Sequence, residues 1–81
     1  MAKVHLGAAL RDLTDGVAEI DIEADTVRAL INQLDSQFPG LGARLREGTS
    51  VAINGDIMPD ALYEEIPPGA EIHFLPSLSG G

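Results

Sequence analysis

The sequence predicts an α+β fold, in which one main helix packs across one face of a mixed sheet of four to five strands. Several short segments alternate apolar and polar side chains, which is the period of a half-buried strand. One longer segment, residues 27–38, instead repeats its apolar side chains at helical spacing. Asn54 and Gly55 lie between two strand-like segments and are typical of a two-residue hairpin turn.

The first strand is expected at residues 2–6, where Val4 and Leu6 share one face and Lys3 and His5 share the other. The alternation then stops, because residues that favour helices follow and a Thr-Asp-Gly turn comes after them. A second strand is expected at residues 17–23. Its isoleucines alternate with acidic residues, so its outer face should carry a solvent-exposed row of carboxylates: Glu19, Asp21 and Glu23.

The main helix should begin at a capping side chain, either Asp25 or Thr26. Its apolar residues lie on one stripe and are Val27, Leu30, Ile31, Leu34 and Phe38. Pro39 and Gly40 should end this helix, because proline cannot continue the hydrogen-bond ladder. A short second helical segment is expected at residues 41–46.

Three further strands are expected in the second half of the chain. Residues 50–54 form the first, with Val51 and Ile53 facing inward, and residues 57–58 form its short return after the hairpin turn. Residues 59–66 are irregular, and Pro-Pro-Gly at 67–69 makes another turn.

The last strand is expected at residues 70–75, with Ile72 and Phe74 on one face and Glu71, His73 and Leu75 on the other. The first and last strands both alternate strongly, so we expect them to lie side by side at the centre of the sheet. His5 and His73 would then project from the same outer face. Two histidines without a third ligand make a weak metal site, so we expect surface or partner-contact histidines and no bound metal.

The length of 81 residues predicts one domain, residues 1–75, followed by a flexible tail, residues 76–81. The absence of cysteine excludes disulfides, thiolate zinc sites, iron–sulfur clusters and a cysteine nucleophile. A net charge of −8 argues against nucleic acid and anionic membranes as partners. No apolar segment approaches the roughly 20 residues of a membrane span, so a soluble, cytoplasmic protein is expected.

The tail has little that could attach it to a core, and it contains an apolar residue, Leu78, followed by Ser79, Gly80 and Gly81. Because glycine lacks a Cβ atom, a Gly-Gly end can enter a narrow channel and present its carboxylate to the active site of a partner. The alternative is an inert, frayed terminus.

Three segments together resemble the β-grasp family of sulfur carriers and ubiquitin-like proteins. They are Val-Ala-Ile-Asn-Gly-Asp at 51–56, Ile-Pro-Pro-Gly-Ala-Glu-Ile-His-Phe-Leu-Pro at 66–76 and Ser-Gly-Gly at 79–81. Ala-Ala-Leu-Arg-Asp-Leu at 8–13 is similar to a loop of the molybdopterin synthase small subunit, and the Leu-Arg-Asp-Leu-Thr-Asp-Gly run and Phe-Pro-Gly-Leu at 38–41 also look like carriers for cysteine synthesis. The resemblance covers almost the whole chain and implies a ubiquitin-like β-grasp fold.

The resemblance also implies a function. The Gly81 carboxylate would be adenylated with ATP by a ubiquitin-activating-type adenylyltransferase and then converted to a thiocarboxylate. The acceptor of this sulfur would be the molybdopterin synthase large subunit, in molybdenum cofactor biosynthesis, or alternatively a cysteine synthase homologue or an enzyme that makes another sulfur metabolite, such as thiamine. The chain would be a carrier without its own catalysis or bound cofactor. Its partner-docking residues would be Leu75, Leu78, Ser79 and Gly80.

Two other functions are compatible with the sequence. A ubiquitin-like modifier would use the same adenylate to form an isopeptide bond with a lysine of another protein. Lys3 is the single lysine of this chain, so extended chains of copies are not expected. The second alternative is an interaction domain with an inert tail, whose binding would not change if the two last glycines were removed.

Overall fold

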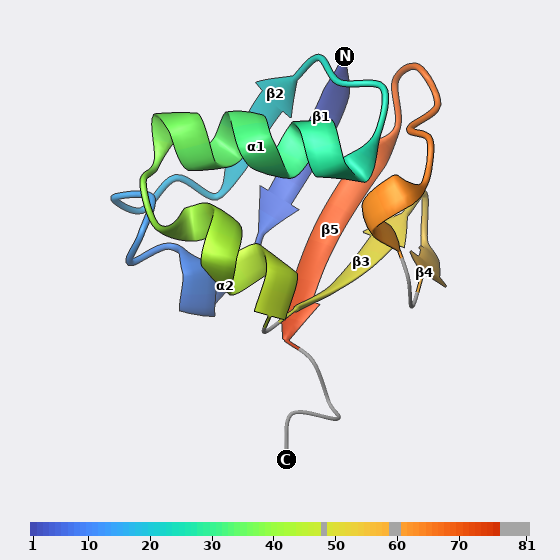
Figure 1. Cartoon of the computed structure of the whole chain (residues 1–81). Helices are drawn as coiled ribbons and strands as arrows, with labels where there is room; N and C mark the ends of the chain where they lie inside the picture. Colours follow the sequence, from blue (N-terminus) through green and yellow to red (C-terminus); the bar gives the residue numbers. More distant parts are fainter. Residues whose placement is uncertain (48, 59–60, 77–81) are drawn as a thin grey trace.

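Five strands form one mixed sheet, and two α-helices cover one of its faces (Figure 1). The computed structural model describes residues 1–47, 49–58 and 61–76. The elements, with η for short 3₁₀ helices, are β1 (Ala2–Leu6), η1 (Ala8–Leu10), β2 (Glu19–Ile22), α1 (Val27–Gln37), α2 (Leu41–Glu47), β3 (Thr49–Ile53), β4 (Asp56–Met58), η2 (Ala61–Tyr63) and β5 (Glu71–Pro76).

The strand order is β2-β1-β5-β3-β4, so the first and last strands are neighbours at the centre of the sheet. β1 and β5 run parallel, and His5 is directly opposite His73 in their register. The other three strand pairs are antiparallel. This arrangement confirms the predicted α+β class and is the ubiquitin-like β-grasp topology that the resemblance implies.

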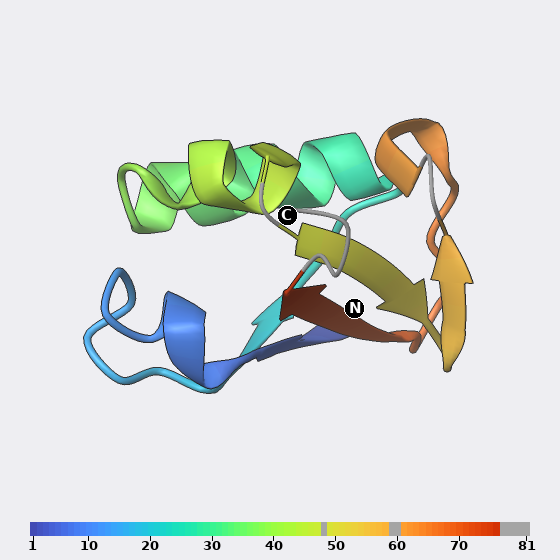
Figure 2. The same ribbon diagram turned by 90° about the horizontal axis from the view of Figure 1, so that it is seen from below.

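Both α-helices lie on the same side of the sheet, and none of the described residues forms an α-helix on the opposite side (Figure 2). The α1 helix begins where Thr26 caps it, since the backbone N–H of Ala29 donates to Thr26 Oγ1 at 3.2 Å. The predicted stripe is buried along α1, except that Phe38 is partly buried at its C-terminal end. The core between the two layers therefore forms from this stripe and the inward residues of the sheet.

The inward side chains of β5 are Ile72 and Phe74, which are 0% and 1% exposed. They pack in one cluster with the inward residues of β1 and with Leu41 and Leu45 of α2. Burial of such side chains is the main favourable contribution to folding. The inward side chains of the central strands β1 and β5 are therefore part of the core.

The hairpin between β3 and β4 has the conformation that Asn54 and Gly55 predict, with φ values of 50° and 88°. Asn54 also connects this turn to β5. Its backbone N–H donates to the Glu71 carbonyl oxygen, and its side-chain Oδ1 accepts from the Glu71 N–H, both at 2.9 Å. The turn and the start of β5 are thus held together.

Several predicted boundaries differ from the structure. β2 lacks Val17 and Ala18, because buried Thr14 donates through its hydroxyl to the Val17 carbonyl at 2.9 Å and keeps this segment in the loop. It also ends at Ile22, so Glu23 lies outside the strand. The helical tendency of residues 8–13 gives only the three-residue η1. Residues 61–63, within a segment predicted to be irregular, form η2, and β5 includes Pro76 at its end.

Candidate functional site

The strand β5 leads directly into the predicted tail. It pairs with β1 on one side and with β3 on the other, and the pairing with β3 continues to its last residue, where Pro76 is opposite Thr49. Because its inward side chains are buried, β5 offers a rigid base for the residues that follow it. Of the predicted site residues, Leu78, Ser79, Gly80 and Gly81 lie outside the described residues, and Leu75 lies within them.

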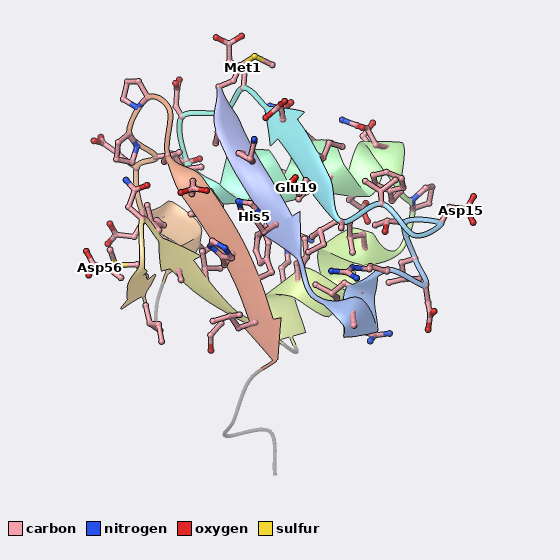
Figure 3. All side chains as sticks on the ribbon, turned by 180° about the vertical axis from the view of Figure 1, so that it is seen from behind. Met1, His5, Asp15, Glu19 and Asp56 are labelled. Atoms are coloured by element: carbon pink, nitrogen blue, oxygen red, sulfur yellow. The ribbon has the colours of Figure 1, made fainter. Side chains whose placement is uncertain are left out.

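The sheet surface opposite the helices, which we call the outer face, carries His5 and Glu19 (Figure 3). The predicted docking residue Leu75 lies on this face, because side chains alternate along β5 and Phe74 points into the core. It alternates with buried Phe74 and is directly opposite Ser50 of β3. The residue is 39% exposed, so part of its apolar side chain is available to a partner. The prediction that Leu75 points away from Ile72 and Phe74 is confirmed.

His5 and His73 also lie on the outer face, as predicted. Their rings stack with centroids 4.3 Å apart and an interplanar angle of 9°. His5 lies between two carboxylates, since its Nδ1 is 3.5 Å from Glu19 Oε1 and its Nε2 is 3.2 Å from Glu71 Oε1. These contacts fix the orientation of His5 and, through the stack, that of His73.

These side chains do not form a metal centre. Within residues 1–47, 49–58 and 61–76, no group of three or more histidine, aspartate or glutamate side chains is arranged to hold a metal ion. The stacked rings are nearly parallel and cannot both direct a nitrogen at one ion between them. Their arrangement suits a rigid contact surface.

Two outer-face residues were not singled out from the sequence, Ala52 of β3 and Ile57 of β4. Ala52 is opposite His73 on one side and Ile57 on the other. Ile57 is 63% exposed, which makes it one of the largest exposed apolar side chains in the described chain. A signal was available, because a two-residue turn at Asn54 and Gly55 fixes the register of the hairpin and places Ile57 beside Ala52.

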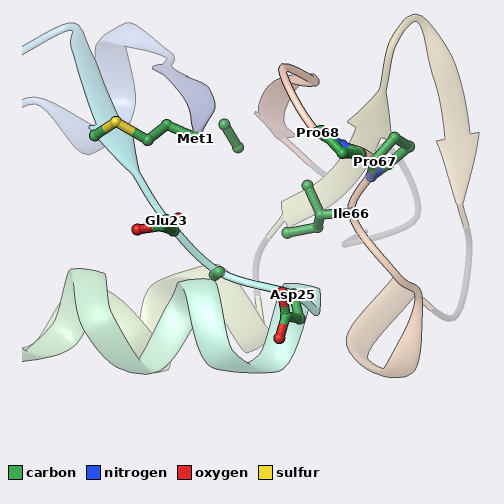
Figure 4. A pocket seen from close by; sticks show the side chains of 8 residues that line it. Met1, Glu23, Asp25, Ile66, Pro67 and Pro68 are labelled. Carbon is green, nitrogen blue, oxygen red and sulfur yellow. The ribbon is translucent and has the colours of Figure 1, made fainter.

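A shallow pocket of about 130 Å³ lies at the other end of the sheet (Figure 4). Ala2 lines it at the start of β1, and Ile66, Pro67 and Pro68 line it just before β5. Because β1 and β5 are parallel, this pocket is at the end of β5 that is far from the tail. It is therefore separate from the candidate site.

Comparison with protein families gives a match between residues 4–81 and the family model of the ThiS family. The chain belongs to the ThiS family. This membership confirms the resemblance to β-grasp sulfur carriers, and the match extends from Val4 within β1 to the last residue of the sequence. Comparison with curated proteins gives no match.

Solved structures support the same assignment. A chain of the BexX/CysO complex of Amycolatopsis orientalis is similar over 100% of both chains, with 25% identity and a TM-score of 0.87. SAMP1 of Haloferax volcanii has 26% identity and a TM-score of 0.72 over 99% of this chain and 98% of its own. CysO of Mycobacterium tuberculosis, at 21% identity, shares the fold with a TM-score of 0.86 over 96% of this chain and 100% of its own.

Members of this family are small carrier and modifier proteins. Within the described part of the chain, none of the helices has the length and apolar character needed to cross a membrane.

Proposed function

We propose that this ThiS-family protein carries sulfur as a thiocarboxylate on Gly81. The observation that carries the proposal is the position of the Ser-Gly-Gly sequence at 79–81, shortly after the central strand β5. A central strand holds the start of the tail in place, and glycines without Cβ atoms can pass into the active site of another protein. The ThiS-family match extends through these residues.

The proposed chemistry has three steps. An oxygen of the Gly81 carboxylate attacks the α-phosphate of ATP on a ubiquitin-activating-type adenylyltransferase, which gives an acyl adenylate and releases pyrophosphate. Sulfide then attacks the acyl carbon and displaces AMP, which leaves a thiocarboxylate. The thiocarboxylate sulfur finally attacks an electrophilic carbon of the precursor on the acceptor enzyme and displaces its leaving group, which gives a thioester. Water then hydrolyses this thioester, which restores the Gly81 carboxylate and leaves the sulfur on the product as a thiol.

The carrier contributes the reacting carboxylate and a docking surface, while positioning and proton transfer belong to the partner enzymes. Leu75 on the outer face and Leu78 in the tail would be apolar anchors on both sides of the strand end. Ser79 and Gly80 would occupy the channel that leads to the active site. The chain would bind no cofactor of its own, and ATP would be a substrate of the activating enzyme.

The proposal also concerns which enzyme accepts the sulfur from the carrier. The segment at 8–13 favours the molybdopterin synthase large subunit, and the similarity at 38–41 makes a cysteine synthase homologue the alternative. Adding each enzyme with its own precursor to the thiocarboxylate form would distinguish the two. The enzyme that converts the thiocarboxylate back to the carboxylate, with sulfur in its product, is the acceptor.

The decisive experiment is the intact mass of the full chain after incubation with ATP, a sulfur donor and the adenylyltransferase of the same organism. The expected result is a mass increase equal to the replacement of one oxygen by sulfur. A variant that lacks Gly81 is the matched control and should keep its original mass. An unchanged mass of the full chain, with an adenylyltransferase that is active on another carrier protein, would contradict the proposal.

A protein modifier is the second candidate, because SAMP1, a small archaeal modifier protein by name, is among the similar structures. In this case the Gly81 acyl group would be transferred from the adenylate, or a thioester formed from it, to a lysine amine of another protein. Mass spectrometry of a cell extract would then find Gly81 linked to lysine side chains. Conjugates without any thiocarboxylate would favour the modifier over the carrier.

A further inference from the structure

We infer that the basic side chains near the end of β5 are arginines because a lysine there would be acylated by the activated tail of its own chain. The residues concerned are Arg11 and Arg46. This inference rests on the proposed function, since it concerns the selectivity of the Gly81 acyl group after activation. Arginine at these two positions leaves the acyl group available to sulfide.

The competing reaction is the formation of an amide within one chain. A neutral amine attacks the Gly81 carbonyl carbon of the adenylate or of a thioester, AMP or the thiol leaves, and the nitrogen loses a proton. A lysine side chain is neutral in a small fraction of molecules near neutral pH, whereas a guanidinium stays protonated and does not attack. A lysine within reach of the tail would have an effective concentration of the order of millimolar and would compete with sulfide.

The tail reaches only side chains that lie near the end of β5. The last residue described before the tail is Pro76, which is directly opposite Thr49. The chain of residues 77–81 spans at most about 17 Å when it is fully extended. Any amine that is to attack Gly81 must therefore lie within this distance of Pro76, apart from the length of its own side chain.

The natural amines of the chain lie at the other end of the sheet. Lys3 is the single lysine and is directly opposite Glu71, which is about 17 Å along β5 from Pro76. The tail would have to lie fully extended back along β5 to reach it, at a large cost in conformational entropy. The α-amine of Met1 lies still further from the end of β5 (Figure 1).

Arg11 lies beside the end of β5. Its Nε atom donates to the Leu6 carbonyl oxygen at 3.3 Å, and Leu6 is directly opposite Phe74. Phe74 is only about 7 Å along the strand from Pro76, so Arg11 is well within the range of the tail. A lysine ammonium can donate to a carbonyl oxygen as well, so this contact alone does not require arginine.

Arg46 lies near the same strand end, on the helix side. It belongs to the last turn of α2, and at most about 11 Å of chain separates it from Thr49, which is opposite Pro76. Figure 1 shows α2 next to this end of β5. Arg46 Nη2 donates to Asn32 Oδ1, and its positive charge suits the end of a helix. Lysine would supply both of these, so what arginine adds is a positive charge without a nucleophilic amine.

The test uses the full chain with Gly81 converted to a thioester, which cleavage of an intein fusion provides without the adenylyltransferase. The natural chain should lose its thioester only by hydrolysis. Arg11→Lys and Arg46→Lys, made one at a time, should lose it about tenfold faster or more, because the amine and the acyl group belong to one molecule. The product should weigh one water less than the hydrolysed chain, and peptide mapping should find Gly81 joined to the introduced lysine.

Two variants are matched controls. Arg28→Lys introduces a lysine at the start of α1, where the neighbouring Val27 N–H donates to the Glu64 carbonyl oxygen at 3.1 Å in the segment that precedes β5. This position is at the end of the sheet away from the tail, so the thioester should hydrolyse at the natural rate. Arg46→Gln removes the guanidinium without introducing an amine and should also hydrolyse at the natural rate. Melting curves of all four variants would verify that each is folded.

The outcomes separate this inference from the proposed function. If folded Arg11→Lys and Arg46→Lys both hydrolyse at the natural rate, or if the natural chain joins Gly81 to Lys3, the inference is wrong. The thiocarboxylate is measured separately, by the intact mass of the natural chain after incubation with the adenylyltransferase, ATP and sulfide. If the lysine variants form the amide but the natural chain forms no thiocarboxylate, the protection by arginine is supported and the carrier function fails.

Discussion

The two faces of the sheet differ in what their side chains contact, although the same strands supply both. On the helix side, Ile72 and Phe74 of β5 are almost completely buried in the core. On the outer face, Glu71 and His73 of the same strand both contact His5, and Leu75 is partly exposed to solvent. Alternation along one strand thus separates the residues that hold the fold from those available to a partner.

This difference has a consequence for a protein of 81 residues. A small domain has a small core, so each inward side chain contributes a large fraction of a total stability of roughly 5–15 kcal/mol. The outer face contributes less and can change more freely. Mutations of inward side chains should therefore lower the stability of the fold, whereas mutations on the outer face should change it little.

The largest effect is expected for Phe74→Ala, which should lower the free energy of unfolding by about 3–5 kcal/mol because it leaves a cavity in the core. Leu75→Ala is the matched variant on the outer face of the same strand, and its effect should be below about 1.5 kcal/mol. Urea denaturation followed by circular dichroism measures both. Equal losses for the two neighbours would contradict the division between the faces.

A second prediction concerns the helical layer that creates the covered face. A Cβ atom at Gly42 would lie 2.9 Å from the Asp35 Cβ atom, so Gly42→Ala should lower the free energy of unfolding by about 1–3 kcal/mol. Asp35 would have to move away from the added Cβ atom. This movement would disturb its Oδ1 atom, which accepts hydrogen bonds from the N–H groups of Gly40 and Gly42 at 3.2 and 2.9 Å.

Thermal melting is a suitable measurement for Gly42→Ala, with Ala43→Ser at the next, exposed position as its control. The control should change stability by less than about 0.5 kcal/mol. If Gly42→Ala is as stable as the natural chain, the two helices are packed less tightly than the structure indicates.

Most of the covered face was predictable from the sequence, because burial on one side imposes a period. The stripe of α1, the inward residues Val51 and Ile53, and the central pairing of the first and last strands all follow from such periods. The position of Val17 and Ala18 outside β2 was not predictable, since it depends on hydrogen bonds of Thr14 inside a loop. No local pattern encodes those partners.

The candidate site was predictable to a smaller extent. The outward direction of Leu75 and the shared face of His5 and His73 follow from alternation. The stacking of the two rings and the carboxylates beside His5 depend on side-chain conformations that alternation does not specify. The position of Ile57 beside Ala52 follows from the hairpin register, whereas its 63% exposure is a property of the folded chain.

A third prediction addresses Asn54, at the turn where β3 passes to β4. Asn54→Ala should lower the free energy of unfolding by about 1–2 kcal/mol, because it places a less suitable residue at a φ of 50° and removes the acceptor of the Glu71 N–H. Asn54→Gly tolerates the φ angle and loses only the hydrogen bond, so it should cost less. Chemical denaturation of the three proteins gives this order, and a Gly variant less stable than the Ala variant would contradict it.

The smallest effect on stability is expected for Glu19→Gln on the outer face. The Glu19 side chain is 56% exposed and 3.5 Å from His5, and an exposed ion pair of this kind contributes little because water and salt screen it. The free energy of unfolding should change by less than about 0.5 kcal/mol. A stability loss as large as that of Asn54→Ala would show that the outer face also holds the fold, and the separation between the two faces would then be wrong.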